Sequence, residues 1–270
     1  MYENRTLFLC LGVGVTDLYQ LICYNLKILL FFNGQEANLN NVYREEKKFL
    51  ISIQEARAKS GYLEQYLTED AHNGAIGYTI RSLYFDSIND VDYFGKLDGL
   101  ELRRKIRLRI YDPSNDFAML EMKQKQGQYQ LKRSLKISRE HAKALAAGDY
   151  TPLLLYPEDF AAECYALMNM ELYRPKTIVE YNRKAFIAKE NKIRVTFDSN
   201  IRATESSFDL YSPSLNMNPV LDPYSVVLEV KYNGFLLDYI KNALGTINRN
   251  ELSVSKYMLA RQAAYKYVIL

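Results

Sequence analysis

The stretch RRKIRLR carries a cation at every second position. These cations are Arg103, Lys105, Arg107 and Arg109. Successive side chains of a β-strand point to opposite faces of a sheet, so this spacing predicts a strand with one basic face. Like charges in such a row repel each other unless an anion lies against them. Arginine and lysine donate charge-assisted hydrogen bonds to phosphate oxygens, so the pattern indicates binding of a chain of phosphates.

Acidic residues occur among the cations of other alternating segments. In MLEMKQKQG, Glu121 shares a predicted face with Lys123, and in VVLEVKY, Glu229 shares one with Lys231. Carboxylates bind Mg²⁺ or Mn²⁺, and such an ion bridges phosphate oxygens. Cations mixed with a few carboxylates therefore favour a site that holds a phosphate chain together with a metal.

The elements that position these residues are predicted to be strands, because polar and apolar residues alternate in several segments. Besides RRKIRLR, the alternation is found in YREEKKFLIS, MLEMKQKQG, KIRVTFDSN and VVLEVKY. An open sheet with its charged face in water satisfies this pattern, provided that helices cover the apolar face. A sheet closed into a barrel with helices outside satisfies it equally and leaves no strand edges.

Helices are predicted between the strands. We expect them at residues 54–67, 138–147, 157–170 and 253–268. The second has the clearest boundaries, since Ser138 is a suitable N-cap and Gly148 follows the end. Many strands with few helices indicate an α+β fold built around an antiparallel sheet.

Composition excludes several kinds of site. The net charge of +3 is too small for a protein whose whole surface binds nucleic acid, so a strong positive field must be local. The three cysteines show no CxxC pair, which argues against a disulfide framework and fits a reducing, cytoplasmic location. His72 and His141 are the only histidines, so a histidine metal site or a catalytic triad has little material.

The N-terminal part of the chain differs from the rest. Residues 6–32 form the most apolar stretch and are long enough to span a bilayer, although Asp17, Gln20 and Lys27 interrupt them. Both a membrane contact and a segment outside the folded domain are compatible with this composition. The linker-like residues 33–41 follow, so we expect a boundary between residues 1–40 and a domain at 41–270. The sequence predicts no oligomeric state.

Eight segments in order resemble the VTC-type polyphosphate polymerase domain of the triphosphate tunnel metalloenzyme superfamily. They are YREEKKFLI, IRSLYFDS, KLDGLELRRKIRLRIY, LEMKQKQG, VEYNRKAF, IRVTFDSNIRA, VLEVKY and SVSKY, and they extend from Tyr43 to about Tyr257. The resemblance implies a closed antiparallel eight-stranded β-barrel, or tunnel, with helices packed outside and a C-terminal helix. It also implies transfer of the terminal phosphoryl group of ATP to inorganic polyphosphate, with Mn²⁺ or Mg²⁺ as cofactor.

The same resemblance assigns roles to individual residues by motif. The central catalytic contacts would come from Lys48, Arg107, Arg109 and Lys256. Further phosphate contacts would come from Arg81, Lys105, Lys123, Lys132, Arg183, Arg194, Lys231 and Ser255. The main metal ligand would be Glu229, together with Glu46 and Glu121. In QLKRSLKI, either Lys132 or Arg133 could point inward.

Three other functions compete with the polymerase. A tunnel tripolyphosphatase or nucleoside triphosphatase would use nearly the same lining residues, with water as the acceptor. A non-catalytic polyphosphate-binding module would keep the cations but would have no need of Glu229. A nucleic-acid binder is disfavoured, because it should expose aromatic side chains beside its basic face, whereas the tyrosines here fall mostly among apolar residues.

Overall fold

The structure is a computed structural model. It describes residues 44–127, 129–245, 251, 253 and 255–268. The apolar stretch at 6–32 and the predicted linker lie outside the described residues, so the boundary near residue 40 and the membrane contact stay predictions. Within the described ranges, no helix is both long enough and apolar enough to cross a membrane.

Ten strands form one antiparallel sheet. They are β1 (Arg44–Ser52), β2 (Thr68–Glu69), β3 (Tyr78–Ser87), β4 (Leu102–Ile110), β5 (Phe117–Gln126), β6 (Tyr129–Ser138), β7 (Tyr173–Ile187), β8 (Arg194–Thr204), β9 (Asn218–Pro219) and β10 (Ser225–Asn233). The long strands follow the order β1-β10-β8-β7-β3-β4-β5-β6, while β2 pairs with β7 and β9 with β8. The predicted number of eight is therefore wrong by the two-residue strands β2 and β9.

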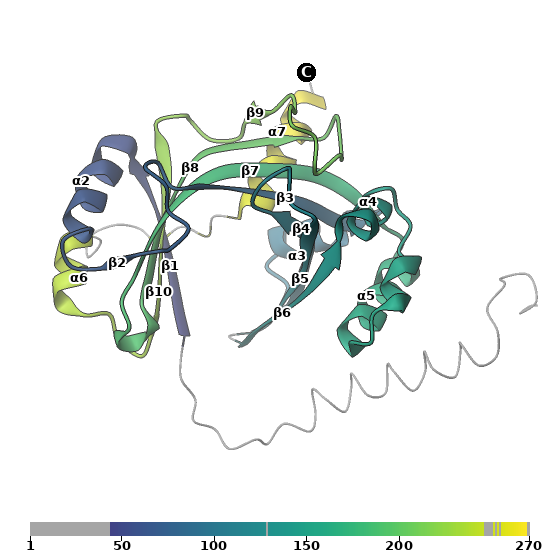
Figure 1. The fold of residues 1–270 in the computed structure, drawn as a ribbon, viewed down its shortest axis with the longest axis horizontal. Coiled ribbons are helices and arrows are strands. Elements are labelled where there is room, and N and C mark those ends of the chain that lie inside the picture. The colour runs from purple at the N-terminus through teal and green to yellow at the C-terminus, as the bar shows by residue number, and fades with distance from the viewer. Residues whose placement is uncertain (1–43, 128, 246–250, 252, 254, 269–270) are drawn as a thin grey trace, which may run out of the picture. The chain divides into compact units, whose positions relative to one another are not determined.

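The predicted closure of the sheet is also wrong. In the described residues no strand pairing joins β6 to β1, and the sheet bends into an arch instead (Figure 1). Side chains bridge part of the opening, because Lys123 Nζ on β5 lies 3.4 Å from a carboxylate oxygen of Glu46 on β1. The free edge of the sheet is strand β6, which carries the largely exposed Lys132 and Tyr129. A charged, solvated edge of this kind disfavours pairing with another strand.

The helices are α2 (Ile53–Leu63), α3 (Val91–Leu97), α4 (Arg139–Ala146), α5 (Asp159–Met170), α6 (Asp238–Leu244) and α7 (Lys256–Val268). Short 3₁₀ turns are found at η1 (Thr151–Leu155) and η2 (Glu190–Lys192). Four of these helices, namely α2, α4, α5 and α7, correspond to the predicted ones. The sequence did not predict α3 and α6, because seven residues are too few to show a helical period.

Two apolar cores lie on the outer face of the arch. One limb, near β1 and β10, is covered by α2 and α6, with Leu63, Phe186 and Leu228 fully buried (Figure 1). The other limb, near β4 and β5, is covered by α4 and α5, with Leu108 and Leu120 fully buried. Burial of these apolar side chains is the main force that holds the helices against the sheet.

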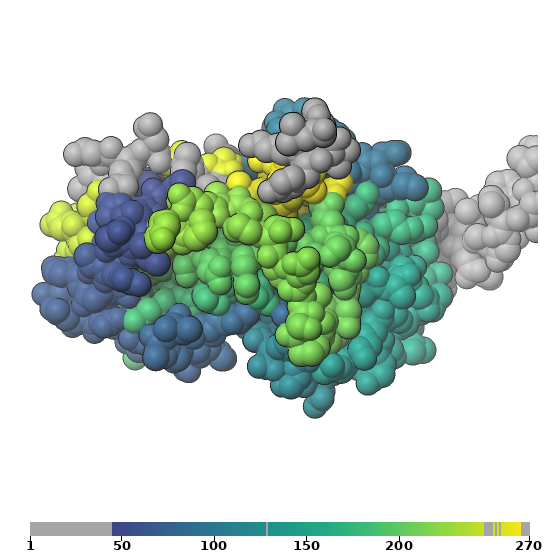
Figure 2. Space-filling model, turned by 90° about the horizontal axis from the view of Figure 1, so that it is seen from above, coloured from purple at the N-terminus to yellow at the C-terminus, as the bar shows by residue number. Residues whose placement is uncertain are grey.

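The connection between β8 and β10 also covers the sheet. In the view from above, light-green atoms of this region lie on the face turned toward the viewer (Figure 2). Arg81 on β3 fixes the connection, since its Nη1 donates to the backbone carbonyls of Leu210 and Ser212 at 3.1 and 2.6 Å. Its Nε donates to Glu180 on β7 at 2.8 Å, and Arg81 is 6% exposed. This arginine is therefore part of the outer packing.

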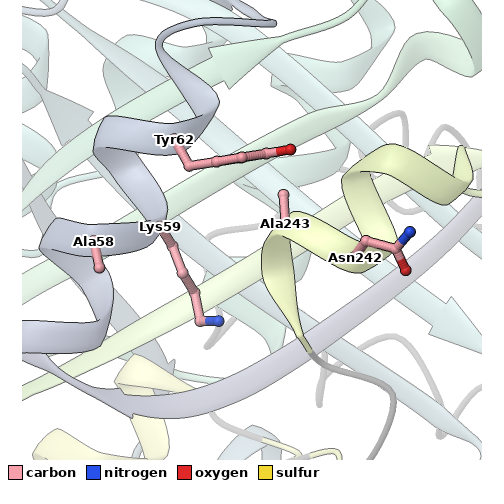
Figure 3. A pocket seen from close by; sticks show the side chains of 5 residues that line it. All are labelled: Ala58, Lys59, Tyr62, Asn242 and Ala243. Carbon is pink, nitrogen blue, oxygen red and sulfur yellow. The ribbon is translucent and has the colours of Figure 1, made fainter.

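A cavity of about 390 Å³ lies between α2 and α6 (Figure 3). It is lined by Ala58, Lys59, Tyr62, Asn242 and Ala243. These two helices cover the outer face of the sheet, and a single cation lines the cavity. It is therefore separate from the basic face that the sequence predicts.

The predicted C-terminal helix is α7, and it packs on the other, inner face of the arch. Tyr257 stacks on Tyr84 of β3 with ring centroids 5.2 Å apart, in a core that includes Tyr181 and Val227. Its hydroxyl donates to the fully buried Asp86 at 2.6 Å.

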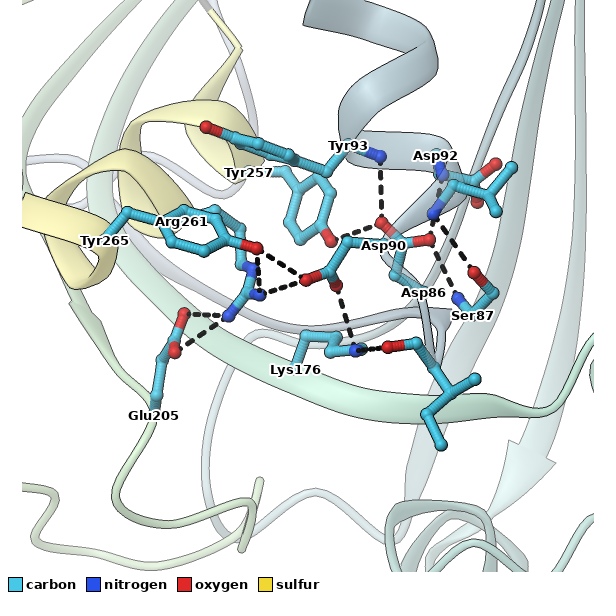
Figure 4. Close-up of polar contacts among 12 residues, drawn as sticks. Asp86, Ser87, Asp90, Asp92, Tyr93, Lys176, Glu205, Tyr257, Arg261 and Tyr265 are labelled. Atoms are coloured by element: carbon cyan, nitrogen blue, oxygen red, sulfur yellow. Dashed lines mark hydrogen bonds and ion pairs between the residues drawn. The ribbon is translucent and has the colours of Figure 1, made fainter. Parts of the chain in front are cut away.

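The middle of α7 is fixed by charge (Figure 4). Arg261 pairs with Asp90 at 2.5 Å and with Glu205 at 2.8 Å, and Tyr265 donates to Asp90 at 2.7 Å. Lys176 on β7 lies 2.9 Å from the other oxygen of Asp90. These contacts hold α7 in one orientation, so the residues at its start have fixed positions against the inner face.

Candidate phosphate-binding site

Lys105, Arg107 and Arg109 define the inner face of the arch. In the strand register, Lys105 is opposite Lys123, and Lys123 is opposite Lys132 on the next strand. Like charges directly opposite each other destabilise a sheet. This row across β4, β5 and β6 is therefore unfavourable by itself, and an anion bound against it would relieve the repulsion.

Glu121 lies among the cations of the next row. It accepts a hydrogen bond from Arg107 Nε at 2.7 Å, and Lys132 Nζ lies 2.5 Å away. Burial alone would raise the pKa of Glu121, but Arg107, Arg109 and Lys132 outweigh it and lower the pKa to about 2. Arg107 also donates to Tyr84 Oη at 2.9 Å, so its donors are largely occupied by the protein.

Arg109 has weaker contacts than Arg107. Its Nη1 lies 3.6 Å from Glu121, and its Nε lies 3.4 Å from Ser82 Oγ. Both distances are long for a hydrogen bond, although the residue is 8% exposed. A guanidinium with five N–H donors and no close partner is well suited to bind phosphate oxygens.

Two further carboxylates lie on β1 and β10. Lys48 Nζ is 2.5 Å from Glu46 and 3.7 Å from Glu229, which also forms a close ion pair with Lys231. Lys231 Nζ in turn is 3.9 Å from Glu46. Burial acts to raise the pKa of Glu229, but Lys231 and Lys48 outweigh it and hold the pKa well below its usual range. Both carboxylates thus stay ionised among lysines.

Asp198 on β8 is a member of the site that the sequence reasoning missed. It is fully buried and accepts two hydrogen bonds from Arg183, at 2.7 and 2.8 Å, while Lys256 Nζ lies 2.5 Å away. This carboxylate therefore joins β7 to the start of α7. Its only sequence signal was its place beside Thr196 in the alternation of KIRVTFDSN, which equally describes a solvated strand face.

Lys105 contacts no carboxylate among the described residues. Its Nζ donates to Ser255 Oγ at 2.7 Å, just before α7. Burial, followed by the charges of Lys48 and Lys123, lowers the pKa of Lys105 from 10.5 to about 7. A half-buried ammonium group among other cations is costly in the absence of an anion.

Changing Lys105 to Met should stabilise the protein at pH 7, by roughly 1–3 kcal/mol after solvent screening is considered. The folded-state pKa of about 7 lies below the unfolded value of 10.5, so the unfolded chain binds more protons between these values. The free energy of unfolding of the parent should therefore rise as the pH rises through this window. Urea titrations at pH 7 and pH 9 measure both effects. Equal pH dependence in parent and variant would show that Lys105 is not strained by its neighbours.

The other predicted residues have different positions. Arg81 lies in the outer packing described above, away from the inner face. Arg194 shares the inner face but lies near its end, where its Nη2 donates to Asp70 at 2.7 Å. The ambiguity in QLKRSLKI resolves in favour of Lys132, since Arg133 pairs with Glu163 of α5 on the outer side. The inner face thus brings together the remaining predicted residues.

The region around Glu229 offers some of the oxygen ligands that a divalent ion needs, and the substrate would have to supply the others. Thr196 is opposite Glu229 in the register and 2% exposed, and its Oγ1 has no hydrogen-bond partner in the structure. Glu46 lies nearby, since the charge of Glu229 acts to raise the pKa of Glu46 and Lys48 contacts both carboxylates. Mg²⁺ is usually held by one or two carboxylates together with substrate phosphates. The residues thus suit an ion shared with the substrate; in the described chain no three His, Cys, Asp or Glu side chains form a complete cage.

Comparison with known families decides the classification. The VTC domain family matches residues 43–265. The chain belongs to the VTC domain family. This finding confirms the resemblance drawn from the eight segments, and the match covers the sheet and most of α7. A search of curated proteins found no match to this VTC domain.

Several solved structures are similar to this VTC domain. A candidate adenylate cyclase from Bacillus halodurans is 13% identical with a TM-score of 0.45, and the alignment covers 79% of this chain and 95% of that one. A Hippeastrum protein, described as a candidate adenylyl cyclase with a dominant triphosphatase activity, is 13% identical with a TM-score of 0.47, covering 81% and 95%. Identities of this size do not establish the activity of the VTC domain here.

Proposed function

We propose that this VTC domain is a polyphosphate polymerase that uses ATP as phosphoryl donor. The observation that carries the proposal is the excess of cations over carboxylates on the inner face. The cations are Lys48, Lys105, Arg107, Arg109, Lys123, Lys132, Arg183, Lys231 and Lys256. The carboxylates are Glu46, Glu121, Asp198 and Glu229. Such a face favours a ligand with several phosphate groups in a row.

The proposed reaction lengthens a polyphosphate chain by one unit. An oxygen of the terminal phosphate of the acceptor forms a bond to the γ-phosphorus of ATP. The bond between this phosphorus and the β–γ bridging oxygen breaks, and the electron pair leaves with ADP. The acceptor oxygen is already deprotonated at neutral pH, so no protein base is needed. Phosphoryl transfer instead requires alignment of the reactants and neutralisation of charge.

The inner face supplies both requirements. Glu121 fixes the guanidinium of Arg107, and Asp198 fixes Arg183 and Lys256, so these cations need little reorganisation when the phosphates bind. Arg109 has free donors that can follow the charge on the transferred group. A divalent ion held by Glu229, Glu46 and the phosphates would neutralise further charge on the phosphate oxygens.

Tripolyphosphate should raise the melting temperature of the protein. A ligand that binds only the folded state stabilises it by about 2.7 kcal/mol at a hundredfold excess over its dissociation constant. Differential scanning fluorimetry with tripolyphosphate, ATP with Mn²⁺, and adenosine measures this effect. We expect clear shifts from the first two ligands and none from adenosine, because the inner face binds phosphate groups.

A shift from adenosine equal to that from ATP would contradict recognition through phosphates. Phosphate monomer at the same concentration is the control for general salt effects, since a single phosphate cannot contact several rows of cations at once. Polymerisation and hydrolysis share this binding step, so the fluorimetry tests the site, whereas the products of ATP turnover test the reaction.

A further inference from the structure

The inner face continues beyond the central residues to the start of β4 and the end of β5. There Arg103 lies opposite Lys125 in the strand register. Lys96, in the last turn of α3, lies at the same end, because α3 packs against β4 and Lys96 Nζ donates to Ser253 Oγ, two residues before the serine that Lys105 contacts. Together with Lys105, these residues form a continuous group of cations. We call Lys96, Arg103, Lys105 and Lys125 the basic mouth.

The basic mouth differs from the rest of the inner face in its lack of counter-charges. In the central region each carboxylate pairs with two or three cations. No carboxylate of the described chain forms an ion pair with any cation of the mouth. Glu101, at the same end, is exposed and lies beside Gly127. The cations of the mouth are all only partly exposed, so water solvates them incompletely.

Two serines accept hydrogen bonds from the mouth. Lys96 Nζ donates to Ser253 Oγ at 2.7 Å, and Lys105 Nζ donates to Ser255 Oγ at 2.7 Å. A serine hydroxyl brings no negative charge, and each ammonium group has three N–H donors. Unused donors and positive charge therefore remain at this position, which is the requirement for binding another anion.

The opposite end of the inner face is compensated. Ser82 of β3 is opposite Arg109 and Tyr84 is opposite Arg107, so Tyr78 lies at the end farthest from Arg103. There Arg194 pairs with Asp70 at 2.7 Å and donates to Tyr78 Oη at 3.1 Å. The two ends thus differ in charge balance. Only the end at the basic mouth has cations without a carboxylate partner among the described residues, so a bound anion is expected to extend toward that end.

We propose that the basic mouth is a second anion site, which binds the phosphates of a long polyphosphate chain that extend beyond the central site. This inference rests on the proposed function, because it assumes that the central residues hold phosphates. A linear polyphosphate carries a negative charge on every unit, so a long chain reaches from Arg107 to Lys105 and on to the other cations of the mouth. Tripolyphosphate is too short to contact both regions fully. The polyphosphate therefore enters or leaves the inner face at the start of β4 and the end of β5.

The test compares two ligand lengths in the full chain. The double variant Lys96→Gln and Lys125→Gln removes two charges from the mouth without changing the central residues. We expect its dissociation constant for long-chain polyphosphate to rise by about tenfold or more, since charge-assisted contacts of this kind are strong. The dissociation constant for tripolyphosphate should change by about twofold or less, because distant charges are screened. Isothermal titration calorimetry measures both constants.

The matched control is the double variant Lys189→Gln and Lys192→Gln, which removes two exposed charges at η2. It should leave the preference for long chains at the parental value. Equal losses for both ligand lengths, or the same loss of long-chain binding in the control, would overturn the second site. If the parent binds neither ligand, the proposed function itself fails. If the parent binds both and the mouth variant keeps the parental preference, only the second site fails.

Discussion

Replacing Arg109 with alanine should lower ATP turnover by at least about a hundredfold, which is the usual loss when a preorganised charge donor is removed. The reason is that Arg109 is buried on the inner face, yet its contacts to Glu121 and Ser82 are 3.6 and 3.4 Å long. Its donors are therefore available to the phosphates. The fold should persist, because Arg107 and Lys132 still pair with Glu121. Turnover is measured by ADP release and the fold by thermal denaturation.

Arg202→Ala is the matched control for this change. Arg202 also pairs with a buried glutamate, Glu180, at 2.7 Å, but on the outer side of the arch. It should keep turnover close to that of the parent. A large drop in the melting temperature of Arg109→Ala, with parental activity per folded molecule, would mean that Arg109 is a structural residue only.

Changing Glu229 to Gln should separate binding of phosphates from turnover. The change keeps the size of the side chain and removes a negative charge from the inner face. Metal-free tripolyphosphate should then bind as tightly as to the parent or more tightly, because one source of repulsion is gone. Metal-dependent turnover should fall by about a hundredfold, since a carboxylate would be lost from the ion shared with the substrate. Titration of Mn²⁺ against activity measures the second effect.

Glu64→Gln serves as the control, because Glu64 pairs with Lys184 on the outer side, beside α2. It should leave both measurements at parental values. An unaltered metal requirement at near-parental rate in the Glu229 variant would show that this carboxylate only neutralises Lys231 and Lys48.

The alternation in the sequence predicted the basic face correctly where polar residues occupy every second position and apolar residues lie between them. Lys105, Arg107 and Arg109 alternate with apolar residues, and the structure places all three on one face. The segment YTIRSLYFD carries no such signal, because both of its parities contain apolar and polar residues. Arg81 was assigned to the phosphates by resemblance alone, and the structure places it in the outer packing.

Closure of the sheet could not be predicted from pattern, because an open arch and a closed barrel need the same alternation along each strand. What differs is whether β6 and β1 form backbone hydrogen bonds, and this depends on the curvature of the whole sheet. Asp198 was missed for a similar reason. Its neighbours in the sequence are those of a solvated aspartate, whereas its partners Arg183 and Lys256 come from distant segments.

The position of α7 is also a tertiary property. Its sequence predicts a helix, but only the contacts of Tyr257 with Asp86 and of Arg261 with Asp90 place it against the inner face. Those two carboxylates lie far away in the sequence, near the end of β3 and before α3. The sequence therefore identified the SVSKY segment through resemblance, not through any local pattern.

The most direct measurement for a polyphosphate polymerase is the product of ATP turnover. The full chain is incubated with ATP, Mn²⁺ and a short polyphosphate primer, and the products are separated on a gel, with Arg109→Ala as the inactive control. We expect a ladder of chains longer than the primer, together with ADP and little free phosphate. Release of free phosphate in equal amount to ADP, without a ladder, would contradict the polymerase and identify a tunnel triphosphatase.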